Sequence, residues 1–228
     1  MGRTLPRNAV MSEWTIDWPA YAPELAPWRP TIEAEIESTR QTIAQLVPPS
    51  ELTVEVRLEP LRVIPELGMV GYCHGPHRFT LSLAPRNPHF APALEEGALR
   101  RQVAHEAHHC LRNAGPGYGL TLGEALVSEG LAGHFVHRLY GTPPEPWECA
   151  LAEDEALSHL PNDDALGATG YDHAGWFFGV GGRRSRWLGY TLGYVVVGRW
   201  LARTTRVDGP TLVNVPAGDV LAAARSDA

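Results

Sequence analysis

The chain has few cysteines, no run of basic residues and no long hydrophobic segment, and each absence excludes a class of protein. Three cysteines in 228 residues are too few and too scattered for a disulfide-stapled scaffold, and they favour a reducing compartment. The net charge of −7 argues against a nucleic acid or an anionic membrane as partner. The most apolar segment, 187–202, is interrupted by Arg199 and is too short to span a bilayer. The first residues contain no apolar signal-peptide core, so we expect a cytoplasmic protein.

The overall composition of the chain is that of a soluble globular protein. Hydrophobic residues make up 44% and charged residues 20% of the chain, whose length suits a single domain with a substantial core. Residues 1–30 differ, because they combine five prolines with three tryptophans. Proline blocks regular structure, whereas tryptophan favours burial. We therefore predict an extended N-terminal arm over residues 1–30, with an exposed peptide-binding arm as the alternative, and a single domain over residues 31–228.

Hydrophobic periodicity predicts an α+β fold with a small mixed sheet and a mostly helical C-terminal half. Alternating apolar residues predict strands at 52–58, 70–73 and 79–83. Apolar residues spaced by three and four predict helices at 31–46, 95–112, 121–135, 188–201 and 215–225, and a further acidic helix within 143–160. The glycine-rich segment 161–186 is expected to form loops near a cleft.

The predicted helix at 95–112 has start and stop signals. Glu95 and Glu96 lie where a helix N-terminus favours negative charge, and the residues at 113–117, Asn-Ala-Gly-Pro-Gly, end the helix.

This helix carries the sequence His105-Glu106-Ala107-His108-His109, an HExxH motif. On a helix, the spacing places two imidazoles one turn apart with a carboxylate beside them, as a catalytic zinc ion requires. At about 100° per residue, His105 lies about 40° from His109 and about 60° from His108, so either pair could bind an ion. Glu106 lies about 60° from His109 but about 160° from His108. A base that shares a water with the metal should lie on the metal's side. We therefore predict His105 and His109 as ligands and His108 as a bystander.

A catalytic zinc usually has three protein ligands and one open position, so another residue must supply the third. In the helix at 121–135, Thr121 and Glu124 have the spacing of a capping box, which gives Glu124 a structural role. Glu129 lies among apolar residues, where a carboxylate is costly unless it is paired or metal-bound. We predict Glu129 as the third ligand, with Glu124 as the alternative. Cys110 could also be a ligand or a nucleophile, but a small buried residue is the favoured interpretation.

The motif followed by Glu129 resembles the gluzincin metallopeptidases, the thermolysin-like group. The residues at 128–132, Ser-Glu-Gly-Leu-Ala, together with those at 176–179 and 189–194, make the chain similar to a bacterial family of predicted zinc-dependent proteases catalogued as a domain of unknown function. The resemblance implies a zincin-like fold, peptide hydrolysis, and residues 79–84 as the sheet edge that pairs with an extended peptide. Thermolysin-like enzymes carry an aspartate four residues after the third ligand, whereas this chain has Gly133.

These residues predict a zinc-dependent hydrolase, most readily a metallopeptidase acting on a peptide or protein. Zn²⁺ would be held by His105, His109 and Glu129, with Glu106 as general base. For the donor to the developing oxyanion, Tyr190 is the first choice and His173 the second. A small-molecule amide or ester hydrolase shares this chemistry and is one alternative. A catalytically silent, zinc-stabilised binding module is the other.

Overall fold

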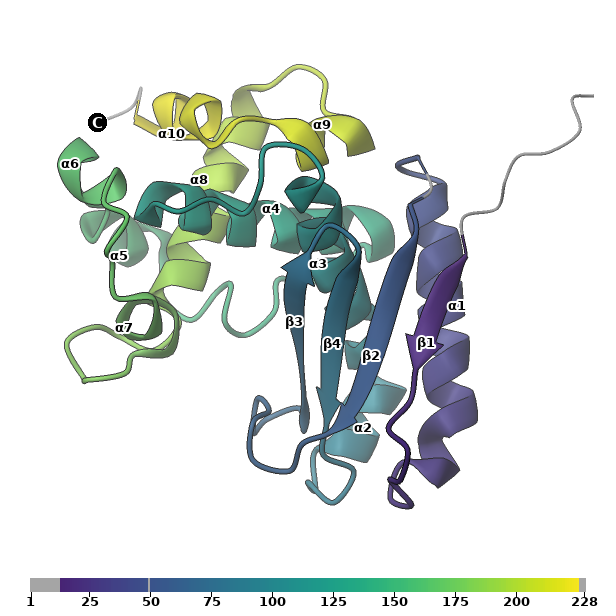
Figure 1. The fold of residues 1–228 in the computed structure, drawn as a ribbon. Coiled ribbons are helices and arrows are strands. Elements are labelled where there is room, and N and C mark those ends of the chain that lie inside the picture. Colours follow the sequence, from purple (N-terminus) through teal and green to yellow (C-terminus); the bar gives the residue numbers. More distant parts are fainter. Residues whose placement is uncertain (1–12, 49, 226–228) are drawn as a thin grey trace, which may run out of the picture.

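The computed structural model describes residues 13–48 and 50–225, which form a mixed α/β fold around a small sheet (Figure 1). In the described residues the sheet has four strands: β1 (Trp14–Asp17), β2 (Leu52–Leu58), β3 (Met69–Gly75) and β4 (Arg78–Leu83). Their order is β1-β2-β4-β3, with β1, β2 and β4 parallel and β3 antiparallel to β4. The predicted small mixed sheet is therefore present, and about half of the chain is helical.

The strand order corrects one expectation. Residues 79–84 were expected to form the sheet edge, but β4 lies between β2 and β3 and is paired on both sides. A tight turn follows β3 and reverses the chain, so β4 pairs antiparallel with β3 on one side. On its other side β4 pairs in parallel with β2. The edge nearest the C-terminal helices is β3 (Figure 1).

Part of the predicted N-terminal arm joins the sheet. Trp14–Asp17 form β1, which pairs with residues 52–55 of β2. A short 3₁₀ turn (Ala26–Trp28) then leads directly into α1 (Arg29–Ala44). Residues 1–12 of the arm lie outside the described residues, and the division of the chain into an arm and one domain stays a prediction.

One face of the sheet packs against α1 and α3 (Ala98–Asn113), and the short helix α2 (Phe90–Glu95) packs against α3. Alternate side chains of β2, namely Leu52, Val54 and Val56, are buried on this face, which is the arrangement that period-two patterning predicts. The core therefore lies between the sheet and α3, and it holds α3 against the edge strand β3.

The helix predicted at 95–112 is interrupted at its start. Glu95 is the last residue of α2, and Gly97 has a φ of +76°, so α3 begins only at Ala98. A left-handed residue cannot continue a right-handed helix, and glycine adopts this conformation without steric cost. The predicted acidic first turn of α3 was therefore wrong, because this turn contains no acid.

The C-terminal half is helical. It comprises α4 (Leu122–Tyr140), α5 (Glu153–Ser158), α6 (Asp163–Leu166), α7 (His173–Phe178), α8 (Leu188–Arg203), α9 (Gly209–Asn214) and α10 (Ala217–Arg225). The backbones of α4 and α8 touch, since a Cβ at Gly130 would lie 2.1 Å from the carbonyl oxygen of Gly193. Helix α4 also packs against α3 (Figure 1).

Two predictions in this half were only partly right. The segment 143–160 is helical only at α5, because Pro143, Pro144 and Pro146 prevent a helix in its first part. The segment 161–186 contains α6 and α7 as well as loops. Among the described residues, no helix combines the length and apolar character needed to cross a bilayer.

Candidate metal centre

Helix α3 presents the motif because its other faces are occupied by the core. Leu99, Val103, Ala107 and Cys110 are buried, and they anchor the helix against the sheet and α4. The remaining stripe carries His105 and His109, whose rings lie 4.7 Å apart with their planes nearly perpendicular. The (i, i+4) spacing thus brings the two imidazoles to one side of the helix, as the sequence predicts.

Helix α4 supplies the acid that faces them. Thr121 caps the helix and forms the expected capping box with Glu124, so the start of α4 is well defined. Two turns further on, Glu129 lies in contact with both histidines. Its side chain is 8% exposed, against 13% for His105 and 5% for His109.

The three potential ligand atoms form a compact triangle. Oε2 of Glu129 lies 3.1 Å from Nε2 of His105 and 3.5 Å from Nε2 of His109, and the two Nε2 atoms are 3.1 Å apart. Around a tetrahedral zinc with bonds of about 2.0–2.1 Å, ligand atoms lie about 3.4 Å from one another. The spacing therefore fits a zinc ion bound by two imidazoles and one carboxylate, and in the described residues no other group of His, Cys, Asp or Glu has such spacing.

The negative charge gathered around the triangle also suits a cation. Burial would raise the pKa of Glu129, but the charge of His109 and hydrogen bonds from His105 and His109 hold it well below its usual range. Burial lowers the pKa of His109, which favours the neutral imidazole that metal binding requires. Burial also acts to lower the pKa of His105, yet its hydrogen bond to Glu129 and the nearby acids raise it to about 9. The protein thus concentrates negative charge around His105.

Glu106 lies beside this triangle and under the edge strand. Burial raises its pKa to about 8, with the charge of His105 and a backbone hydrogen bond from Cys73 acting in the opposite direction. A Cβ at Gly71 of β3 would lie 2.2 Å from Cγ of Glu106, so the strand backbone rests directly on the carboxylate side chain. The backbone N–H of Gly71 donates to Oε1 of Gln102, one turn before Glu106 on α3. Residues of β3 and α3 therefore hold Glu106 in one place.

A cavity of about 390 Å³ opens next to His105 and Glu106. Apolar and aromatic side chains dominate its walls, among them Ile64, Val70, Trp147, Phe178, Trp187 and Tyr190. Trp187 has a φ of +70°, the left-handed conformation that a residue of this size adopts only under constraint from its surroundings. Arg186 lies over the Trp187 ring and pairs with Glu66, so it ties the loop before α8 to the loop before β3. Such local strain is typical of functional sites.

The two residues predicted as oxyanion donors lie near this cavity in different positions. Tyr190 lines the cavity together with Glu106, and burial with the charges of Glu129 and Glu106 raises its pKa well above the usual range. His173 stacks on Phe177, which in turn packs edge-on against Tyr190. Nδ1 of His173 is hydrogen-bonded to the hydroxyl of Tyr171. The structure therefore places Tyr190 at the cavity and His173 one aromatic ring behind it.

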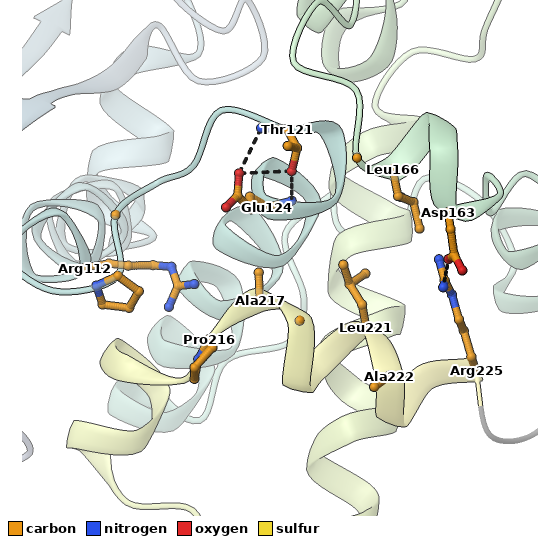
Figure 2. Close-up of a pocket in the computed structure, with 14 residues that line it drawn as sticks. Arg112, Thr121, Glu124, Asp163, Leu166, Pro216, Ala217, Leu221, Ala222 and Arg225 are labelled. Atoms are coloured by element: carbon orange, nitrogen blue, oxygen red, sulfur yellow. Dashed lines mark hydrogen bonds and ion pairs between the residues drawn. The ribbon is translucent and has the colours of Figure 1, made fainter.

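Two other candidates point away from the triangle. His108 is buried, and its Nε2 bonds to the carbonyl oxygen of Leu212 in α9. Glu124 lines a separate cavity of about 510 Å³, where its Oε2 accepts hydrogen bonds from the backbone of Leu120 and from Thr121 (Figure 2). In the same view Arg112, a buried arginine that bonds to Ser128, reaches toward this cavity from α3.

Two residues of the site, the partly buried Tyr118 and the buried Glu148, were not predicted. Tyr118 donates a hydrogen bond from its hydroxyl to Oε1 of Glu129 at 2.8 Å. Glu148 occupies the space beside Gly133, where an added Cβ would lie 2.1 Å from its Oε1. Burial raises the pKa of Glu148 to about 7, and its charge acts on His105. Gly133 occupies the position where thermolysin-like enzymes carry an aspartate. In this chain a carboxylate from another segment, that of Glu148, lies beside the position. Both residues lie in irregular segments, where periodicity gives no signal.

These features define a buried centre of two imidazoles and one carboxylate, built on an HExxH helix and the helix that follows it. The chain belongs to the family described as "Predicted Zn-dependent protease (DUF2268)", which matches residues 33–222. The resemblance to this family of predicted zinc-dependent proteases is thereby confirmed. No curated protein and no solved structure matches the chain. The family description itself names zinc as the metal.

Proposed function

We propose that the chain is a zinc-dependent metallopeptidase of zincin-like fold, with His105, His109 and Glu129 as metal ligands. The observation that carries the proposal is the triangle of ligand atoms, with sides of 3.1, 3.1 and 3.5 Å, beside a buried and uncoordinated Glu106. A purely structural zinc site more often uses cysteines and is closed, and it has no need of a free acid beside the metal. The arrangement therefore favours hydrolysis over a silent binding module.

Zinc bound at this site would polarise the scissile carbonyl and make a water molecule acidic enough to attack near neutral pH. Glu106 accepts the proton of the attacking water and delivers it to the leaving nitrogen. The backbone of Cys73 and the packing of Gly71 keep its carboxyl group on the side of the triangle. Tyr190 donates a hydrogen bond to the oxyanion that develops on the substrate, and His173 is the second candidate for this role.

The substrate side of the site supports a peptide. Strand β3 is an edge strand beside α3, so an extended chain can pair with it across the mouth of the site. The adjoining cavity of about 390 Å³ has the size and apolar lining to accept a large side chain. The same cavity supports the second candidate function, hydrolysis of a small-molecule amide or ester, because its volume lies within the usual range of ligand sites.

The decisive experiment compares Glu106→Gln with the wild type in zinc content and in the digestion of casein and a peptide library. We expect the variant to bind one zinc as the wild type does and to lose hydrolysis. A chelator should abolish the wild-type activity, and added zinc should restore it. Glu95→Gln, which alters an exposed glutamate on α2, is the matched control and should keep both properties. An active Glu106→Gln variant would refute the base assignment, and cleavage of small amides but no peptides would favour the second candidate.

A further inference from the structure

Two cysteines that are 37 residues apart in sequence face each other beside the candidate metal centre. Sγ of Cys73 on β3 lies 3.4 Å from Sγ of Cys110 on α3, and both thiols are free. Cys110 is buried, whereas Cys73 is partly exposed. Cys110 is buried, as the sequence predicts. The three cysteines are scattered in the sequence, and the fold brings two of them into contact.

The position of this pair suits covalent closure. A disulfide needs its sulfur atoms about 2.05 Å apart, so the two atoms must approach by a little more than about 1 Å. Rotation of the side chains and a small shift of β3 can supply this movement, because β3 is paired along one side only. Neither sulfur belongs to the triangle of His105, His109 and Glu129. The proposed hydrolysis therefore leaves both thiols without a role.

We propose that Cys73 and Cys110 form a modification site, a reversible intrachain disulfide that ties the edge strand to the motif helix. The oxidant is a low-molecular-weight disulfide such as oxidised glutathione. The Cys73 thiolate attacks one of its sulfur atoms and releases one thiolate, which leaves a mixed disulfide on Cys73. Cys110 then attacks the Cys73 sulfur and releases the second thiolate. Two protein thiols are oxidised, the small disulfide is reduced to two thiols, and the two protons pass to the released thiolates.

The surroundings of Cys73 favour it as the first nucleophile. Nδ2 of Asn113 donates to its sulfur at 3.5 Å, and its exposure gives a small oxidant access. The neighbouring Cys110 thiol lowers the pKa of Cys73 to about 7, although burial acts in the opposite direction. A thiolate is the reactive form of cysteine, and the lowered pKa makes Cys73 the thiol of the pair that provides it more readily.

Formation of the disulfide should shift the carboxylate of Glu106, because the backbone of Cys73 hydrogen-bonds to that carboxylate. We expect the oxidised protein to hydrolyse peptides several-fold more slowly than the reduced protein. This consequence rests on the proposed function, whereas formation of the disulfide does not.

The test uses the zinc-supplemented full chain carrying Cys149→Ser, so that Cys73 and Cys110 are the two thiols counted. Cys149 is exposed, and its sulfur contacts the carbonyl oxygen of Glu145. The protein is equilibrated in glutathione buffers of graded oxidised-to-reduced ratio, quenched with acid, unfolded and labelled with a maleimide. We expect both remaining thiols to lose their label together, with a mass lower by two hydrogens and no glutathione adduct, and dithiothreitol to restore them. The matched Cys73→Ser variant in this background should keep Cys110 labelled at every ratio.

Two results would overturn the inference: both thiols labelled at the most oxidising ratio, or a stable glutathione adduct on Cys73 with Cys110 still labelled. The rate of peptide hydrolysis is then compared before and after oxidation. An unchanged rate in the fully oxidised protein would contradict the proposed effect on Glu106. Absence of hydrolysis in every redox state would instead count against the proposed function, and the thiol count would still decide whether the disulfide forms.

Discussion

Tyr118 and Glu129 are joined by a hydrogen bond of 2.8 Å between the phenol hydroxyl and Oε1, the carboxylate oxygen that does not face both histidines. The Tyr118 ring also packs edge-on against His109, with 5.3 Å between ring centroids. One side chain thus contacts two of the three proposed ligands and orients the carboxylate. A side chain that hydrogen-bonds to a metal ligand both orients the ligand and changes the affinity for the metal.

Removing this hydroxyl should weaken the binding of zinc. We expect Tyr118→Phe to lower zinc affinity by about tenfold, because the carboxylate loses the bond that orients it. Competition with a chromophoric chelator measures the change. Tyr140→Phe is the matched control, since its hydroxyl bonds to Thr39 away from the site, and it should bind zinc like the wild type. Equal affinities for all three proteins would mean that Tyr118 has no role in orienting Glu129.

Tyr190 should affect catalysis rather than metal binding. We expect Tyr190→Phe to reduce kcat about 10²–10³-fold, the usual effect of losing one oxyanion donor, with zinc affinity unchanged. Steady-state kinetics on a peptide substrate provides the measurement, and His173→Ala in parallel tests the second candidate. If Tyr190→Phe keeps the wild-type kcat while His173→Ala loses it, the donor is His173.

Gly71 should be intolerant of a side chain. A Cβ at this position would lie 2.2 Å from Cγ of Glu106, so Gly71→Ala must displace the carboxylate or the strand. We expect hydrolysis to fall at least about tenfold while bound zinc stays near one equivalent, since a small misplacement of a catalytic group is costly. Gly218→Ala on α10 has open space around the added methyl group and should keep the wild-type rate. Full activity of Gly71→Ala would show that the position of Glu106 is not critical.

The sequence predicted the parts of the site that follow a regular period. The HExxH helix, the capping box at Thr121 and the strands at 52–58 and 79–83 all depend on local spacing, and the structure has each of them. Strand order is a long-range property, so alternation at 79–83 could not reveal that β4 is internal and β3 is the edge.

Other features depended on single irregular residues. Gly97 lies inside the pattern that predicts one helix over 95–112, yet its positive φ separates α2 from α3. Tyr118 and Glu148 reach the site from connecting segments, whose paths are determined by tertiary packing and not by periodicity. The contact between Cys73 and Cys110 has the same origin, because it depends on which strand lies beside α3.

Glu148 should make stability depend on pH. Burial raises its pKa from the ordinary 4.5 to about 7, against the hydrogen bond from the Glu145 backbone, so the folded protein binds more protons than the unfolded chain between these values. The folded state is therefore favoured below pH 4.5 and loses stability as pH rises through about 7. Relative to Glu148→Gln, the wild type should lose about 2–3 kcal/mol between about pH 5 and pH 8, at about 1.4 kcal/mol per pKa unit.

Urea unfolding of both proteins at each pH, with a chelator present so that no metal alters the charge, measures this difference. A constant difference for Glu148→Gln would contradict the raised pKa.

The most direct test of the metal centre is X-ray absorption at the zinc edge of the zinc-loaded wild-type protein. We expect the zinc to be coordinated by nitrogen and oxygen alone at about 2.0–2.2 Å, with the outer-shell scattering of two imidazoles. A zinc–sulfur distance of about 2.3 Å would place Cys73 or Cys110 on the metal and contradict the account, as would protein that retains no zinc.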